Sequence, residues 1–595
     1  IKISGKYTKT KKSKILIDLM EENLLSYNDI LLGKSHILKI EEYKNQVGTS
    51  ERTGAVIEPR LTLQWWVDMK KFVAKNPQVL DAVMNDEIKF HPANMKNTYK
   101  HWIDNIKDWC ISRQLWWGQR IPAWYDEAGN FVVAKTHEEA IAKYNTQFPT
   151  SNIQQLKQDD DVVDTWFSSW LWPISVFDGF EKMENGRVSK NNADIKYYYP
   201  TNDLVTAPEI MFFWVARMIM AGYEWMGEKP FNNVYYTGIV RDKQRRKMSK
   251  SLGNSPDPLD LIAQYGADGV RMGMLLSSPA GNDILFDESQ VEQGRNFANK
   301  IWNAFRLVKG FEVKPDAEFD AAILESNNIS ADWFRGKLND AYAEINEKYT
   351  DYKLSEVLMS MYKLIWDDFC AWYLEMIKPE YGKPINESTY NQTLAFFDEL
   401  MRLLHPFMPF ITEEIWQSLG AKKEGESICV AAYPFGSNQA TNKVTAPKLD
   451  LAFEVIQQIR NLRNSKGISP KETFDIAIKS TQEDMYKPYV FLIKKLANIG
   501  NITFVNDKQD KAVLLPVDTD EVYAFLNLQI DVEAEKEKIN KEIEYLEGFM
   551  KSVDAKLSNE KFVANAKPEL VEKERQKKAD AVAKIEVLKG SLASL

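Results

Sequence analysis

Cysteine is scarce in this chain of 595 residues, which contains Cys110, Cys370 and Cys429 and no C-x-x-C pair. Such widely spaced cysteines argue against a disulfide framework and against a cysteine-bound zinc knuckle, and they fit a reducing compartment. No stretch approaches the roughly 18 apolar residues that a membrane span needs. The basic start, IKISGKYTKTKKSK, has no apolar stretch behind it that would make it a secretory signal. We therefore expect a cytoplasmic protein with no structural zinc and no membrane partner.

An excess of positive charge is also lacking, because the formal net charge is −9. This excludes a wholly basic nucleic-acid coat, but phosphate contacts need only a local basic stripe. The chain is too long for one hydrophobic core, and its length predicts roughly three to five domains.

The sequence pattern changes several times along the chain. From residue 61 to 288, short apolar runs such as NNVYYTGIVRD alternate with helical runs such as EIMFFWVARMIMAGYEW, which predicts α/β units around a parallel sheet. Apolar residues at helical spacing then predict an all-helical bundle over residues 289–435. A small mixed segment is expected at 436–525.

The last stretch, residues 526–595, has the pattern of a coiled coil. Apolar residues follow one another in steps of four and three, at Ile539, Ile543, Leu546, Met550, Val553 and Leu557. This is a heptad seam, and the break at Pro568 before a second charged helix predicts an antiparallel two-helix hairpin. The alternative is a long solvated helix.

A basic loop, RRKMSKSLGNS, runs from Arg245 to Ser255 after an expected strand and before an expected helix. Lys247 and Lys250 supply mobile positive charges, and the serines and backbone N–H groups supply short donors, so the loop suits a phosphate. Lysines on such a loop can stabilise the charge on a leaving pyrophosphate. The alternative is a solvated basic turn. This alternative is less favoured because a strand precedes the loop and GNSPDP and a helix follow it.

The loop Lys247-Met248-Ser249-Lys250-Ser251 resembles the signature loop of the class I aminoacyl-tRNA synthetases. The surrounding DWCISRQLWWGQRIPAWY, DDVVDTWFSSWLWPIS and SLGNSPDPLDLIAQYGADGVRM resemble the valyl-tRNA synthetases, in the branch that also holds the isoleucine and leucine enzymes. The terminal KLSNEKFVANAKPELV is similar to the arm that ends the valyl enzymes. The resemblance covers nearly all of residues 40–595.

The resemblance implies an α/β fold that combines part of a class I Rossmann-like nucleotide-binding domain, an all-α anticodon-binding bundle and a C-terminal coiled-coil hairpin. It also implies a monomeric ligase that uses ATP with magnesium to activate valine to valyl-adenylate and then transfers valine to tRNA(Val). The five loop residues named above would form the catalytic loop, in which Lys250 contacts the triphosphate with help from Lys247. Met248 would lie near the adenine, and Glu209 near the ATP ribose.

Trp166 in DTWFSS and Trp214 in FFWVARM match family positions that wall the amino-acid pocket. Two rigid indoles can set the depth of a cavity for a branched aliphatic chain. The alternative is that both are ordinary core residues among the 17 tryptophans of the chain.

A pocket shaped for valine rejects threonine only about a hundredfold, so the family hydrolyses threonyl products in an inserted editing domain. Residues 1–60 resemble the far end of that insertion, and residues 61–288 the C-terminal half of the catalytic domain. The family's His-x-Gly-His element is absent, because none of the five histidines, His36, His91, His101, His137 and His405, stands in such a context. We therefore expect the chain to correspond to the C-terminal two-thirds of a synthetase and to be inactive alone.

Three positions depart from the family pattern, which usually has glycine at Arg245, histidine at Gln119 and a Gly-x-Asp ending at Glu209. Arg245 could add charge for pyrophosphate or hinder a turn that glycine eases.

Contacts with tRNA are expected from the bundle at 289–435, from the arm at 526–595 and from the basic patch Arg460–Lys466, which could equally be an ordinary surface segment. Two other functions stay open at this stage. One is a non-catalytic tRNA-binding module, and the other is a sister isoleucyl or leucyl enzyme.

Overall fold

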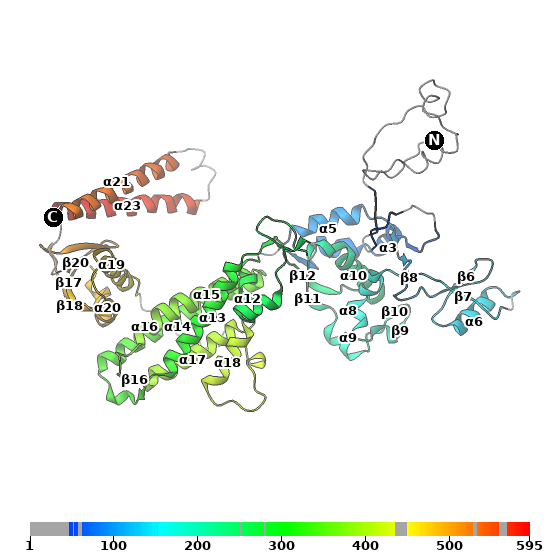
Figure 1. The fold of residues 1–595 in the computed structure, drawn as a ribbon, viewed down its shortest axis with the longest axis horizontal. Coiled ribbons are helices and arrows are strands. Elements are labelled where there is room, and N and C mark those ends of the chain that lie inside the picture. Colours follow the sequence, from blue (N-terminus) through cyan, green and yellow to red (C-terminus); the bar gives the residue numbers. More distant parts are fainter. Residues whose placement is uncertain are drawn as a thin grey trace, which may run out of the picture. The chain divides into compact units, whose positions relative to one another are not determined.

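The computed structural model describes residues 47–50, 53–57, 62–150, 153–249, 252–278, 281–434, 449–526, 532–558 and 568–594 (Figure 1). The chain divides into two compact units, Ile1–Lys75 with Ile106–Ser168, and Asn76–Asn105 with Ser169–Leu595. Most of the editing remnant assigned to residues 1–60 lies outside the described residues.

In its described residues, the first unit contains short antiparallel strands and the helices α3 (Met69–Lys75) and α6 (His137–Gln147). Its pairs are β1 (Trp66–Val67) with β3 (Trp109–Cys110), β4 (Ser112–Arg113) with β8 (Val162–Val163), and β5 (Ala123–Tyr125) with both β6 (Phe131–Val133) and β7 (Lys157–Gln158). The helix α7 (Thr165–Ser169) begins at its end. Thr136 caps α6, because its hydroxyl accepts the Glu139 N–H at 3.3 Å.

A parallel sheet forms the α/β part of the second unit. Its strand order is β11 (Thr201–Thr206), β12 (Phe231–Tyr236) and β2 (Lys89–His91), so the middle strand comes last along the chain. Phe231, Val234 and Tyr236 are buried, as a central strand that is covered on both faces requires. The parallel sheet predicted for residues 61–288 is therefore present.

Helices and short strands surround this sheet. Before β11 these elements are α4 (Gln78–Met84), α5 (Met95–Asp104), α8 (Trp172–Ser175), β9 (Met183–Glu184), β10 (Arg187–Val188) and α9 (Ala193–Tyr198). After β11 they are α10 (Ala216–Ala221), flanked by the π-helical η3 (Met211–Val215) and η4 (Gly222–Met226), then β13 (Val240–Arg241), α11 (Pro258–Tyr265), α12 (Ala267–Leu276) and β14 (Ile284–Leu285).

After β12 the backbone passes very close to the backbone of Asn282. A Cβ on Gly238 would lie 1.8 Å from the backbone oxygen of Asn282, so only glycine fits there. This close approach lets β13 pair in parallel with β14, and the segment that follows β13 is the basic loop.

The predicted helical bundle follows and is drawn in green to yellow in Figure 1. Its core contains Phe334, Phe369, Tyr373 and Phe396, whose rings lie against one another with centroids 4.8–5.5 Å apart. The elements are α13 (Glu288–Lys309), β15 (Val313–Lys314), α14 (Ala321–Thr350), α15 (Leu354–Lys363), η7 (Leu364–Tyr373), α16 (Leu374–Ile377), β16 (Ile385–Asn386), α17 (Glu387–Leu404), α18 (Pro409–Leu419) and η8 (Ile428–Val430).

The mixed segment contains a four-stranded sheet of order β18-β17-β20-β19 and two helices. They are α19 (Asp450–Lys466), β17 (Phe474–Lys479), α20 (Val490–Ala497), β18 (Ile499–Phe504), β19 (Val513–Val517) and β20 (Asp520–Phe525).

The last two helices, α21 (Val532–Leu557) and α23 (Pro568–Ser594), pack against each other through Ile543, Leu546, Ile585 and Leu588. Their ion pairs join Glu542 to Lys584, Asp554 to Lys578 and Lys556 to Glu574. The residue numbers of the partners in α23 fall as those in α21 rise. The two helices are therefore antiparallel, in agreement with the expected hairpin (Figure 1). Supercoiling of the pair stays a prediction.

Among the described residues, no helix combines the length and the apolar character that crossing a membrane requires.

Candidate active-site loop

The basic loop lies at the carboxyl edge of the parallel sheet. β11 ends at Thr206, and a 3₁₀ turn, Pro208–Ile210, carries Glu209. β12 ends at Tyr236, and the chain continues through β13 into the loop. In open α/β sheets this edge is where ligands bind.

Lys247 and Glu209 meet at this edge. The Lys247 Nζ lies 3.1 and 3.4 Å from the two carboxylate oxygens of Glu209, and the side chains are 60% and 48% exposed. An ion pair this exposed contributes about 0–1 kcal/mol, so a ligand phosphate can compete for the lysine at little cost. The structure therefore brings together two of the residues that the sequence singled out.

Asp242 and Asn254 hold the two ends of the loop together. Asp242 accepts the backbone N–H groups of Gln244 and Arg246 at 3.0 and 2.9 Å, and its other oxygen accepts the Asn254 amide at 2.9 Å. The bond from Asn254, followed by those from Arg246, lowers the pKa of Asp242 to about 2. The carboxylate is thus ionised at neutral pH, which is the form that accepts these bonds.

Asn254 also fixes the middle of the loop. Its side-chain oxygen accepts the Ser249 N–H at 2.9 Å, and its amide lies 3.4 Å from the backbone oxygen of Lys247. Sequence reasoning missed Asp242 and Asn254, although Asn254 lies only three positions after Ser251. The available signal was an asparagine at the end of the loop, because its side chain can both accept and donate hydrogen bonds to the nearby backbone.

Arg245 adopts the left-handed backbone conformation, with φ of 64°. Its N–H donates to the Asp242 carbonyl at 2.8 Å, which closes the turn. Glycine takes this conformation without the steric cost that a Cβ adds, so the arginine strains a turn that glycine would ease.

The cations near the start of the loop face acidic partners. Arg241 pairs with Asp283, and Lys243 Nζ lies 3.4 Å from Asp287. Lys250 and Ser251 fall outside the described residues, so their predicted contacts stay predictions. Met248 and Ser249 are half-buried.

Trp166 and Trp214 belong to different units, and each is described by itself. The Trp166 backbone N–H donates to Asp164 at 2.9 Å in the first unit. In the second unit the Trp214 indole donates to the Ser169 carbonyl at 3.0 Å, and its ring lies 5.9 Å from that of Trp172. Both tryptophans are half-buried, and the pocket predicted between them stays a prediction.

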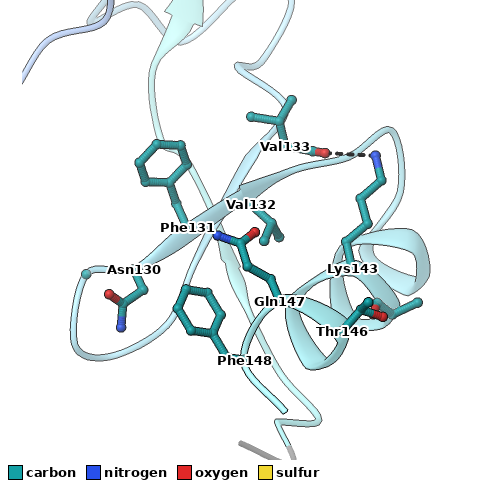
Figure 2. A pocket seen from close by; sticks show the side chains of 10 residues that line it. Asn130, Phe131, Val132, Val133, Lys143, Thr146, Gln147 and Phe148 are labelled. Carbon is teal, nitrogen blue, oxygen red and sulfur yellow. Dashed lines mark hydrogen bonds between the residues drawn. The ribbon is translucent and has the colours of Figure 1, made fainter.

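Gln119 is exposed, and its carbonyl accepts the Val163 N–H at 2.8 Å. The first unit also has an open hollow of about 800 Å³, shown in Figure 2, between β6 and α6. Phe131, Lys143 and Phe148 line it, and none of the predicted site residues does.

In the basic patch Arg460–Lys466, both arginines contact other parts of the protein. Arg463 is 6% exposed and donates to four backbone carbonyls, those of Ser469, Glu472, Ala497 and Asn498, at 2.7–3.0 Å. Arg460 lies over the Trp372 ring at 5.4 Å. The phosphate-binding interpretation is therefore wrong for Arg463, because both terminal nitrogens of its guanidinium already donate to backbone carbonyls inside the protein.

The comparisons with known proteins agree with this arrangement. Residues 7–287 match the family model of tRNA synthetases class I (I, L, M and V), residues 331–478 the anticodon-binding domain of tRNA ligase, and residues 531–595 the valyl tRNA synthetase tRNA binding arm.

Individual relatives carry the name valine–tRNA ligase. The protein from Phocaeicola vulgatus is 53% identical over 560 residues, and that from Christiangramia forsetii is 51% identical over 561 residues. Each alignment covers 94% of this chain and 62% of the relative. A solved methionyl-tRNA synthetase from Mycobacterium tuberculosis, in complex with methionyl-adenylate, aligns with 64% of this chain and 68% of its own at 18% identity and a TM-score of 0.44, which is too weak a likeness to carry an argument. The chain is thus similar to the valine–tRNA ligases of the class I tRNA synthetases along 94% of its length, and it spans 62% of the length of the curated relatives it matches.

Proposed function

We propose that this chain forms part of an ATP-dependent ligase that joins valine to tRNA(Val). The observation that carries the proposal is the identity of about half the residues with valine–tRNA ligases along 94% of the chain. The terminal arm match favours the valine enzyme over the isoleucyl and leucyl alternatives.

In the proposed activation step, a valine carboxylate oxygen bonds to the α-phosphorus of ATP, and the bond from that phosphorus to the pyrophosphate oxygen breaks. Pyrophosphate leaves with the added negative charge, and magnesium enters with ATP. Lys247 would turn from Glu209 to this charge, together with Lys250. The Glu209 carboxylate, freed of its lysine, could then accept hydrogen bonds from the ribose hydroxyls.

The clamp of Asp242 and Asn254 supports this role of the loop. It anchors Ser249 and the backbone of Lys247, so that the lysine side chain can move while the backbone stays in place. Met248 next to it would contact the adenine, and Trp166 and Trp214 would bound the valine side chain. We further propose that the chain works as a monomer, with the helical bundle and the α21–α23 pair contacting tRNA(Val).

Binding of tRNA tests the specificity part of the proposal. The 595-residue chain is titrated with valine tRNA and isoleucine tRNA at one moderate salt concentration. We expect a clear preference for valine tRNA. Equal, weak and strongly salt-dependent binding to both would mean generic phosphate contacts and would overturn the assignment.

Valine-dependent ATP–pyrophosphate exchange tests the chemistry. We expect none from these 595 residues alone, because they hold no His-x-Gly-His element. Joined to the part of the Phocaeicola vulgatus relative that the alignment does not cover, the chain should catalyse exchange. Failure of that chimera would support the alternative of a non-catalytic tRNA-binding module.

Two variants of the chimera test the loop. Lys247→Ala should lower exchange by about 10²-fold or more, the usual cost of losing one group that stabilises transition-state charge. Lys243→Ala is the matched control, because it removes the same charge two positions before the loop, at a residue that faces Asp287. Equal losses in the two variants would show that general loop charge, and not Lys247, supports the reaction.

A further inference from the structure

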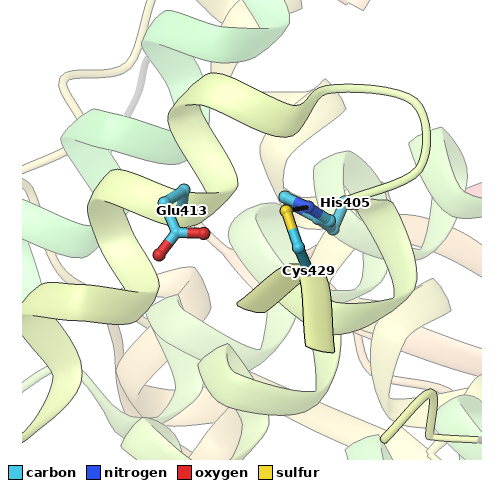
Figure 3. A group of neighbouring side chains, drawn as sticks. All are labelled: His405, Glu413 and Cys429. Carbon is cyan, nitrogen blue, oxygen red and sulfur yellow. Dashed lines mark hydrogen bonds between the residues drawn. The ribbon is translucent and has the colours of Figure 1, made fainter. Parts of the chain in front are cut away.

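Three side chains that could bind a metal ion converge beside the α17–α18 corner of the helical bundle (Figure 3). His405 follows the end of α17, Glu413 lies in α18, and Cys429 lies in the short helix η8. One ligand atom from each of the three lies within 4.8 Å of the others. The sequence search for paired cysteines could not find this group, since it mixes three residue types at unequal spacing.

The hydrogen bonds around His405 suit the tautomer that carries its proton on Nδ1. In this assignment the Thr412 hydroxyl donates to the Met408 carbonyl at 2.8 Å and accepts from His405 Nδ1 at 2.7 Å. Nε2, with its lone pair, then faces the Cys429 Sγ 3.2 Å away.

This arrangement is how proteins prepare a histidine ligand. A metal-binding imidazole usually donates its other N–H to a neighbouring acceptor, which sets the tautomer and the ring orientation.

The distance between His405 Nε2 and Cys429 Sγ is close to that in a zinc site. With zinc–sulfur and zinc–nitrogen bonds of about 2.3 and 2.0 Å, a tetrahedral site separates the two ligand atoms by roughly 3.5 Å. The observed 3.2 Å needs only a small rotation of the exposed Cys429 side chain.

Glu413 is held in place as the third ligand. One oxygen accepts the Ser427 hydroxyl at 2.7 Å and the Ile428 N–H at 3.1 Å, and the other accepts the Gln417 amide at 2.7 Å. The second oxygen keeps a lone pair for an ion, because a carboxylate oxygen has two acceptor positions.

We infer that His405, Glu413 and Cys429 form a binding site for a zinc-class divalent ion, with water completing the coordination. Imidazole, thiolate and carboxylate are the ligand set that zinc takes. On binding, the Cys429 thiol gives its proton to solvent, and the sulfur–hydrogen bond is replaced by a sulfur–metal bond. The ion ties η8 to the α17–α18 corner, and this role is independent of the proposed ligase activity.

Cobalt(II) is a suitable probe, because a cobalt–thiolate bond absorbs light whereas a cysteine that only donates a hydrogen bond does not. The metal-free 595-residue chain is titrated with cobalt and then with zinc. We expect one equivalent of cobalt to produce a thiolate-to-metal band, and zinc to displace it because zinc binds more tightly.

Variants assign the band to this site. Cys429→Ser should abolish it, whereas the matched control Cys110→Ser should keep it. Burial raises the pKa of Cys370 to about 12, so that thiol is a poor competitor for the ion. Thr412→Val, which removes the acceptor of the Nδ1 proton, should weaken binding by about 10- to 100-fold without touching a ligand.

Zinc should also raise the thermal unfolding temperature of the chain, and Cys429→Ser should remove that increase while keeping the helical circular dichroism signal. A missing thiolate band in the unaltered chain would mean that Cys429 only hydrogen bonds to His405. A band that persists in Cys429→Ser would place the metal elsewhere. Either result would overturn the inference.

Discussion

The clamp at the foot of the loop can be tested by replacing Asn254 with alanine. The change removes the acceptor of the Ser249 N–H and the donor to Asp242, while the backbone stays unaltered. Both partners lie near the surface, so water can replace the lost bonds. We therefore expect a loop that opens more often and a fold that is otherwise preserved.

The magnitude follows from the hydrogen bond to Ser249. A bond of this neutral kind contributes about 0.5–1.5 kcal/mol net, which corresponds to roughly 2- to 13-fold more frequent opening. Hydrogen–deuterium exchange with mass spectrometry measures this on peptides that cover residues 240–256. Exchange at the Ser249 amide should accelerate by that factor in Asn254→Ala.

Asn282→Ala is the matched control, because among the described residues the Asn282 side chain makes no hydrogen bond, although its backbone borders the same edge. It should leave exchange in the loop unchanged. If Ser249 exchanged at the same rate in Asn254→Ala, Asn282→Ala and the unaltered chain, the clamp would not hold the loop and the reasoning would be refuted.

Three further predictions concern the loop and the mixed domain. The pKa of Asp242 is lowered from 3.8 to about 2, so protection of the loop amides from exchange should be complete above pH 3.8 and lost as the pH falls towards 2. In Asn254→Ala the same exchange assay should show this loss at a higher pH. At Arg245, glycine should slow exchange in the turn and valine should speed it, with a difference on the order of 1 kcal/mol, because a β-branched residue resists φ of 64°. Arg463→Ala should lower the free energy of unfolding by about 3 kcal/mol, since the donor to four carbonyls is lost, whereas exposed Lys471→Ala should change it by less than about 0.5 kcal/mol. The urea dependence of exchange in β17 measures this difference, and equal values would contradict the structural role of Arg463.

The basic loop shows how much of the site could be predicted from the local sequence. The lysines, serines and flanking glycine indicated a phosphate-binding segment between a strand and a helix, and the described part of the loop lies there. Arg245 was recognised as an unusual residue, and its left-handed backbone gives the physical cause. Glu209 was predicted as a site residue only from its position in the family, and its pairing with Lys247 was not predicted. No local rule joins residues that are 38 positions apart.

Arg463 shows where local reasoning failed. A cluster of arginines and lysines favours phosphate binding only while the side chains face solvent. The carbonyls that accept hydrogen bonds from Arg463 come from the turn after α19 and from the end of α20, and the sequence does not say that these segments will meet.

Local sequence patterns were enough to predict the resemblance to valine–tRNA ligases, the parallel sheet, the helical bundle and the antiparallel pair of terminal helices. Those features depend on periodic apolar residues and short motifs, which are local and can be read along the chain. Only folding shows that Asn254 clamps Asp242, that Glu209 pairs with Lys247, and that Cys429 faces Nε2 of His405. Each of these contacts joins residues that only folding brings together, because its geometry depends on how separate elements pack and not on the pattern within any one of them.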